Sequence, residues 1–228
     1  MLVPLESEIG SVYNVNMNDS RSKILACACD LYLREGIEGF SMRKLARELG
    51  VTAPSLYRHY DSKESLLIAV VEEAHRLFAQ RLYRALRART PHERMHRAGA
   101  EYIEFALNNP HLYEMLYVSP HMLGMEEFPE RILDTCAATG QFWQDRVREC
   151  MEAGLLRRGD PEEVSMTMWA HAHGLVTIFL RGLLPVDREA FIHVFQASGG
   201  RLLQGLGGEK AGLWAMDPAA VPGDAVAV

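Results

Sequence analysis

The chain has 228 residues, of which 48% are hydrophobic and 24% are charged, with a formal net charge of −6. This composition favours a packed core over disorder, and no apolar run approaches the roughly 20 residues that a membrane-spanning helix needs. The N-terminus lacks a secretory signal pattern, and four cysteines in a chain of this size do not suggest a disulfide framework. We therefore expect a cytoplasmic protein with reduced thiols.

The charge is distributed unevenly along the sequence. Residues 20–63 contain eight Lys or Arg against five Asp or Glu, a net of +3, so the remainder of the chain carries −9. A basic head on an acidic body is the asymmetry expected when only one end of a protein meets phosphates.

Helical periodicity recurs almost throughout, and strand patterns are nearly absent. Residues 1–19 show no periodicity and are predicted to be a disordered arm, within which Met17 is an alternative start. Three helices are expected next, over residues 20–35, 41–49 and 52–59, with Gly36 and Gly50 breaking the chain between them.

Longer helices follow these three. Asp61 and Glu64 are predicted to form a capping box, with the Asp61 side chain and the Glu64 side chain each accepting from a free amide, for a helix that ends near residue 88. Residues 119–127 are expected to be a loop. Further helix starts are predicted at Thr90-Pro91-His92-Glu93, Asn109-Pro110, Pro129, Asp160 and Asp187. The last three of these helices are expected to end near residues 153, 181 and 206.

The segment SMRKLARELGVTAPSLYRHY, residues 41–60, has the steric pattern of a helix-turn-helix. A small residue, Ala46, stands where the second helix would cross the first, and Gly50 permits the turn four residues later. Apolar residues flank both positions and are expected to pack the two helices together: Leu45, Leu49, Val51 and Leu56. Two ordinary core helices joined by a tight turn would show a similar pattern.

The residues that follow favour the nucleic-acid interpretation. Tyr57, His59, Tyr60 and Lys63 stand together beside the start of the next helix. Free amides at a helix N-terminus together with a lysine are suited to binding phosphate.

Residues 20–67 resemble the tetracycline-repressor (TetR) family. The resemblance rests on fixed spacing over several elements: Gly36, then Gly39-Phe40-Ser41-Met42-Arg43-Lys44-Leu45-Ala46, Gly50-Val51, Leu56-Tyr57-Arg58-His59-Tyr60 and Lys63-Glu64. It implies a homodimer that places one recognition helix of each subunit in successive major grooves of DNA.

The resemblance also implies roles for individual residues. Thr52, Ala53 and Ser55 would lie near base edges, whereas Tyr57, His59 and Lys63 would hold phosphates, with Arg43 and Arg58 as further candidates. Pro54 either touches a thymine methyl group or merely stiffens the short helix.

A second resemblance lies further along the chain. Trp169-Ala170-His171-Ala172-His173-Gly174 is similar to the Trp-x-x-x-His-Gly pattern of one TetR C-terminal subclass, and a helix would bring Trp169 and His173 onto one face. The family resemblance implies a ligand pocket in this region, although each of its large residues alone would also fit a plain core. The predicted ligand-binding residues are Tyr102, Phe105, Met115, Met122, Trp143, Met166, Trp169 and His173.

The predicted fold is therefore all-α and has two parts. Residues 20–66 form an N-terminal three-helix helix-turn-helix DNA-binding domain, and residues 67–206 form a C-terminal helical bundle for ligand binding and dimerisation. The Gly-, Ala- and Pro-rich residues 207–228 are predicted to be a loosely ordered tail. Dimerisation is assigned to the last two helices, which carry apolar and small residues at helical spacing: Phe191, Val194, Phe195, Ser198, Leu202 and Leu203.

Three other classes of function compete with this interpretation. An enzyme is disfavoured because the sequence has no nucleophile elbow, phosphate-binding Gly-rich loop, HExxH or dinucleotide fingerprint. A metal sensor would have His92 and His96 as ligands, but no third ligand is evident. A purely structural adaptor leaves the basic head unexplained. We expect a ligand-responsive repressor without a cofactor that binds a palindromic operator and is released by a small, largely apolar molecule.

Overall fold

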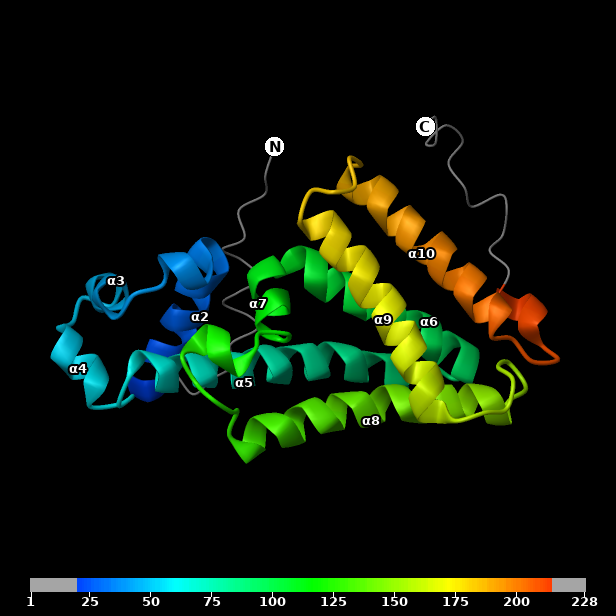
Figure 1. Cartoon of the computed structure of the whole chain (residues 1–228), viewed down its shortest axis with the longest axis horizontal. Coiled ribbons are helices and arrows are strands. Elements are labelled where there is room, and N and C mark those ends of the chain that lie inside the picture. Colours follow the sequence, from blue (N-terminus) through cyan, green and yellow to red (C-terminus); the bar gives the residue numbers. More distant parts are fainter. Residues whose placement is uncertain (1–19, 215–228) are drawn as a thin grey trace. The chain divides into compact units, whose positions relative to one another are not determined.

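The computed structural model of the chain describes residues 20–214 (Figure 1). Its elements are α2 (Ser20–Gly39), α3 (Met42–Glu48), α4 (Ala53–Tyr57), α5 (Lys63–Tyr83), η1 (Arg84–Arg87), α6 (Pro91–Asn108), α7 (Pro110–Met115), η2 (Pro120–Leu123), α8 (Glu130–Glu152), α9 (Pro161–Leu180), α10 (Arg188–Gly205) and η3 (Ala211–Trp214).

The all-α fold class is confirmed. Between residues 20 and 214 there is no β-strand, and the one isolated β-bridge joins Leu156 to Gly207. No helix in this part of the chain is both long enough and apolar enough to cross a membrane. The predicted arm over residues 1–19 and residues 215–228 of the predicted tail lie outside the described residues.

Several helices begin where their capping residues predict. Thr90 and Glu93 form a reciprocal capping box, in which the Thr90 hydroxyl accepts from the Glu93 amide at 3.2 Å and the Glu93 carboxylate accepts from the Thr90 amide at 3.3 Å. The Asp160 carboxylate accepts from the amide of Glu162, two residues on, and that of Asp187 accepts from an amide three residues on, each at 2.8 Å. These bonds satisfy amides that have no partner within their own helix.

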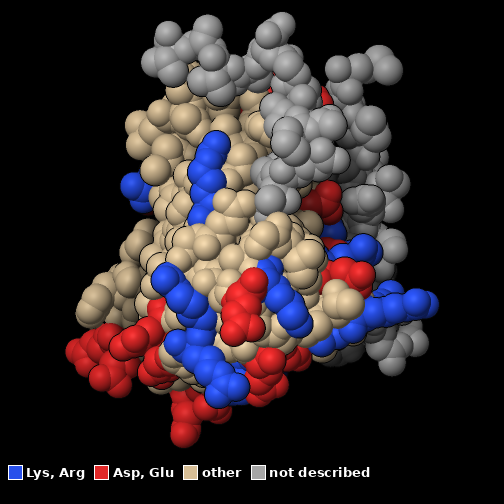
Figure 2. All heavy atoms as spheres, turned by 90° about the vertical axis from the view of Figure 1, so that its right-hand side faces the viewer, with Lys and Arg blue, Asp and Glu red and all other residues tan. Residues whose placement is uncertain are grey.

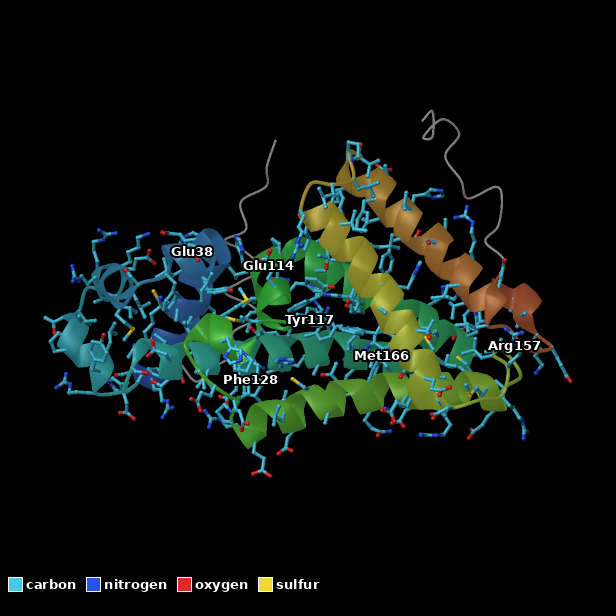
Figure 3. The ribbon with its side chains drawn as sticks, in the orientation of Figure 1. Glu38, Glu114, Tyr117, Phe128, Arg157 and Met166 are labelled. Atoms are coloured by element: carbon cyan, nitrogen blue, oxygen red, sulfur yellow. The ribbon has the colours of Figure 1, made fainter. Side chains whose placement is uncertain are left out.

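The first helix differs from its predicted end. Gly36 takes a left-handed conformation with φ of 64°, which produces a kink, and helical structure then resumes as far as Gly39. Glu38, labelled in Figure 3, lies in this added turn. Sequence pattern located the break correctly but did not show that the helix continues beyond it.

The described residues form two compact units. Residues 20–76 and 109–132 make up the first unit, and residues 77–108 and 133–214 the second. The division falls within α5, and residues 109–132 join the first unit, whereas the sequence analysis placed them with 67–206. The cause is that α7 packs on α2, where the Tyr32 and His111 rings meet edge to face with centroids 6.3 Å apart.

The second unit is built around the aromatic rings of several helices. Phe78 packs on Phe105 at 5.1 Å between centroids, and Phe179 of α9 stacks on Phe191 of α10 at 4.0 Å. Figure 1 shows α9 and α10 as an antiparallel pair, joined by a loop that contains Gly182 with φ of 69°. Burial of these rings holds the helices that surround the cavity described below.

Residues 207–214 correct the expectation of a loosely ordered tail. Trp214 is 1% exposed, and its indole N–H donates to the Leu155 carbonyl at 3.0 Å. Arg157, labelled in Figure 3, donates to the Gly205 carbonyl at 2.5 Å and fixes the same turn. Composition alone was misleading here, because one large aromatic side chain supplies enough apolar burial to fix a short segment.

Replacement of Trp214 tests this packing. We expect Trp214→Ala to lower the free energy of unfolding by about 3–5 kcal/mol, since a buried indole is replaced by a cavity. The neighbouring Leu213 is 57% exposed, so Leu213→Ala should change the free energy of unfolding by no more than about 0.5 kcal/mol. Urea denaturation of the two variants measures both values, and equal values would contradict the assigned role of Trp214.

Candidate nucleic-acid interface and ligand cavity

The turn between α3 and α4 is fixed by backbone geometry. The Ser41 hydroxyl caps α3 by accepting from the Lys44 amide at 3.2 Å. Gly50 then takes a left-handed conformation with φ of 66°, and the Val51 amide donates to the Ala46 carbonyl at 2.9 Å. A residue with a Cβ is strained at such a φ, which is the reason for a glycine at this position.

The two helices pack through fewer residues than the sequence analysis assigned. Leu45, Ala46 and Leu56 are buried, with 0%, 4% and 0% exposure. Val51, however, is 45% exposed, and Leu49 is only half-buried. The turn projects Val51 away from the helix pair, so the predicted packing role of Val51 is wrong.

Side chains of α4 and its flanks present a polar, accessible surface. The hydroxyl oxygens of Thr52 and Ser55 are hydrogen-bonded at 2.8 Å, so these two groups orient one another at the start of α4. Among the predicted DNA-binding residues, Arg43, Thr52, Pro54, Tyr57 and Arg58 are exposed, and Ala53, Ser55, His59 and Lys63 are half-buried. None of the nine is buried, as contact with another molecule requires.

The cap of α5 lies one residue later than predicted. The Ser62 hydroxyl accepts from the Ser65 amide at 3.0 Å, and the Ser65 hydroxyl accepts from the Ser62 amide at 3.1 Å. The predicted box of Asp61 with Glu64 is therefore wrong, since α5 starts at Lys63. Hydrogen bonds from its own amide and from the Ser62 hydroxyl lower the pKa of Glu64.

Ion pairs divide the basic residues of the first unit into two groups. Arg34 donates to both carboxylate oxygens of Glu48, at 2.7 and 2.8 Å, and Lys44 pairs with Glu35. The exposed side chains of three others make no ion pair with any described residue: Arg43, Arg47 and Arg58. Their charges are not neutralised internally and remain available to phosphates.

Arg47 is a further candidate that was not among the residues predicted from sequence. Arg43 and Arg47 are four residues apart in α3, and both are exposed. Helical spacing puts them on one face, which was the signal that could have identified Arg47. Elsewhere, the face drawn in Figure 2 mixes Lys and Arg with Asp and Glu, which is not the continuous basic surface that nucleic acid binding favours.

The second unit contains a partly open cavity of about 280 Å³ between α6, α8, α9 and α10. Aromatic rings form much of its wall, with Tyr102 stacked on Phe195 at 6.4 Å and meeting Trp143 at 6.2 Å. The lining residues are Met95, His96, Gly99, Ala100, Tyr102, Ile103, Trp143, Val147, Ser165, Met168, Trp169, His171, Ala172, Phe195, Gln196, Gly199, Gly200, Leu202 and Leu203. A concave, mainly apolar wall with a few polar groups is typical of small-molecule sites.

Three of the eight predicted ligand-binding residues line this cavity: Tyr102, Trp143 and Trp169. His173 does not line it but stacks on Trp169, with ring centroids 5.3 Å apart. Phe105 is buried against Phe78, and Met166 of α9, labelled in Figure 3, is 56% exposed.

The other two predicted ligand-binding residues, Met115 and Met122, belong to the first unit, where Met115 is fully buried and Met122 is 63% exposed. The structure thus brings neither of them to the lining of the cavity in the second unit. A methionine-rich composition showed that adaptable apolar side chains were present but not which helix face they would occupy.

Residues assigned to dimerisation also occupy unexpected places. Phe195, Leu202 and Leu203 line the cavity, and Phe191 is fully buried within its own unit. In α9 only Val176 is buried, while Trp169 and Ile178 are 37% and 43% exposed. The exposed apolar side chains of the antiparallel pair thus lie mainly on α9 and not on α10.

The histidines proposed as metal ligands have other partners. The Nε2–H of His92 donates to the Leu213 carbonyl at 2.8 Å, and both His92 and His96 pack on the Trp214 ring. Within residues 20–214, no group of three or more His, Cys, Asp or Glu side chains is arranged to hold a metal ion. The imidazole rings of His92 and His96 pack against Trp214 and so help to hold η3 on α6.

Two family profiles match the chain. The profile described as "Bacterial regulatory proteins, tetR family" matches residues 24–70, and that described as "Tetracyclin repressor-like, C-terminal domain" matches residues 95–197. The first match covers α3, α4 and the turn between them, and the second covers most of the cavity wall. Together they span more than half of the chain.

Individual relatives agree with these profiles. The chain is 37% identical over 54 residues to the HTH-type transcriptional regulator SAB2452 of Staphylococcus aureus, a match that covers 24% of this chain and only 29% of that protein. A Rhodococcus sp. RHA1 protein of unknown function has a similar structure, with a TM-score of 0.74 and 24% identity over 86% of this chain and 99% of that one. The structure of AibR in complex with isovaleryl coenzyme A and operator DNA is also similar, with a TM-score of 0.61 and 21% identity over 81% and 98% of the two chains.

Proposed function

The chain belongs to the tetR family of bacterial regulatory proteins, and on that premise we propose that it is a DNA-binding transcriptional regulator, most simply a repressor. The observation that carries the proposal is the α3–turn–α4 unit. Leu45 and Leu56 are buried in it, and the polar side chains of α4 point outward. A helix presented in this way enters the major groove of DNA with its N-terminal residues toward the bases.

The proposed contacts follow from exposure and chemistry. Thr52, Ala53 and Ser55 at the start of α4 face base edges, and the exposed ring of Pro54 is placed to meet a thymine methyl group. The remaining candidates hold the phosphate backbone, to which Arg and Lys contribute charge and Tyr and His contribute hydrogen bonds: Arg43, Arg47, Tyr57, Arg58, His59 and Lys63.

A homodimer is the proposed working form. Exposed apolar side chains of α9, including Met166, Trp169 and Ile178, would be covered by the same face of a second copy. Two recognition helices about 34–36 Å apart would then read the two halves of a palindromic operator. Such a protein would act in the cytoplasm, where the DNA is.

The cavity of the second unit is the proposed effector site. Its wall is mainly apolar, so the effector is proposed to be a small, largely apolar molecule. The stacked pair Trp169 and His173 also supports assignment to the Trp-x-x-x-His-Gly subclass. Residues of α5 belong to both compact units, so this helix is the covalent route by which effector binding would affect the DNA-binding unit.

Selection from a random duplex library tests DNA binding directly. We expect the wild-type protein to enrich a palindromic site at low salt, because both recognition helices contribute base contacts. The variant Tyr57→Ala/Lys63→Ala should lose this enrichment, since it removes two phosphate contacts from each subunit.

A tyrosine outside the recognition helix provides the matched control. Tyr83 is 50% exposed, similar to the 45% of Tyr57, so Tyr83→Ala should enrich the same site as the wild type. Failure of the folded, dimeric wild-type protein to enrich any site would refute the regulator assignment.

Effector binding and DNA binding must oppose one another. If an effector lowers the DNA affinity by some factor, the bound operator must lower the effector affinity by the same factor, typically about 5- to 150-fold. Titration of the selected duplex with and without a saturating cavity ligand, and of the ligand with and without duplex, measures both factors. Unchanged DNA affinity at saturation for every ligand shown to occupy the cavity would contradict the switch.

A further inference from the structure

We propose that the cavity of the second unit selects uncharged molecules and that His171 supplies its specific hydrogen bond. The proposed ligand is a flat, mainly apolar molecule with a single hydrogen-bonding group such as a carbonyl oxygen. This inference rests on the proposed function in taking the cavity as the effector site, and it adds the charge of the ligand and the residue that recognises its polar group.

The charge selectivity follows from the composition of the wall. None of the described residues that line the cavity is Asp, Glu, Lys or Arg. The lining contains two imidazole side chains, those of His96 and His171. Desolvation, with a smaller contribution from neighbouring His92, lowers the pKa of His96.

An ionised ligand would therefore meet no Lys or Arg side chain in the described lining. Transfer of an isolated carboxylate, sulfonate or phosphate from water into an apolar wall is strongly unfavourable unless a cation or several donors face it. A neutral ligand of the same skeleton does not lose this hydration energy. The wall should for this reason discriminate between a neutral molecule and its acidic analogue.

His171 is the lining residue with a buried polar atom that lacks a hydrogen-bond partner among the described residues. Its Nε2 is buried and has no hydrogen-bond partner in the described part of the chain. By contrast, the Ser165 hydroxyl, which is also in the wall, donates to the Glu162 carbonyl at 2.9 Å. A buried polar atom without a partner is unfavourable, and rotation of the imidazole toward a ligand carbonyl would remove that penalty.

The shape of the cavity favours a flat ligand. Tyr102 and Phe195 present rings that are nearly parallel, at 12° to each other, and Trp143 adds a third ring to the wall. Gly99 of α6 and Gly199 of α10 also line the cavity, and a Cβ built on either glycine meets no atom within 4 Å. The two glycines leave open the space that a planar ring would occupy beside these aromatic side chains.

The same glycines allow the cavity to be filled without damage to the fold. Leucine is a better helix former than glycine, and a side chain at position 99 would extend into free volume. Gly140 of α8 offers the matched control, because it is exposed, lies in a helix, has no atom within 4 Å of its Cβ position, and does not line the cavity.

Two fluorescent probes with one skeleton test the charge selectivity on the full chain without DNA. N-phenyl-1-naphthylamine is neutral, and 8-anilino-1-naphthalenesulfonate carries the same rings with an added sulfonate. We expect the neutral probe to bind at least roughly tenfold more tightly than the anion. Gly99→Leu should abolish binding of the neutral probe, and Gly140→Leu should leave it unchanged.

A third probe tests His171. The neutral dye 6-propionyl-2-(dimethylamino)naphthalene carries a ketone oxygen, which the imidazole can meet as a donor. His171→Phe keeps a flat ring of similar size but removes the donor, so it should weaken binding of this dye by roughly tenfold. Binding of N-phenyl-1-naphthylamine, which has no carbonyl, should change by less than roughly twofold in the same variant.

Each outcome decides part of the proposal. Equal affinity for the neutral and anionic probes, or retention of the neutral probe by Gly99→Leu, would overturn the assignment of an uncharged ligand to this cavity. Equal weakening of both neutral probes by His171→Phe, or weakening of neither, would overturn the role of His171. Because no DNA is present, these failures are distinct from failure of the regulator assignment, which the duplex selection measures.

Discussion

The burial of Leu45 and Leu56 on either side of a left-handed Gly50 determines which side chains the first unit presents to its surroundings. With these two leucines buried, the period of the short helix α4 directs Tyr57 and Arg58 outward. The start of α5 follows at once, capped by Ser62, with Lys63 as its first residue. A few apolar contacts and one backbone conformation thus assemble the whole candidate interface.

Electrostatic pairing refines that surface. Glu48 pairs with Arg34, and Glu35 pairs with Lys44. These two basic side chains are therefore less available to an external partner. Exposed ion pairs of this kind contribute little to stability, typically about 0–1 kcal/mol, so their main consequence is local charge balance. What remains is a set of arginines on α3 and at the end of α4 without internal partners among the described residues. The net charge of −6 conceals this local excess of positive charge.

Sequence pattern predicted the helices, most of their caps and the outward residues of α4, because each depends on residues close together in the chain. It did not predict the lining of the cavity, since helical periodicity shows which face is buried but not whether that face meets a core or a void. Phe195 and Leu202 accordingly looked like an interface, and Met115 looked like a cavity residue. The position of Trp214 depends on contacts with residues far away in sequence, such as Leu155, which no local pattern encodes.

The salt dependence of binding to the selected duplex tests most directly whether the unpaired arginines of the first unit hold DNA phosphates. Fluorescence anisotropy between about 50 and 200 mM salt gives the slope of log K against log salt concentration. Arg47→Ala should reduce the magnitude of that slope by about one for each subunit, because each lost contact releases about one fewer counterion. Arg87→Ala, which replaces an exposed arginine of the second unit, should leave the slope unchanged. Equal slopes for wild type, Arg47→Ala and Arg87→Ala would contradict the account.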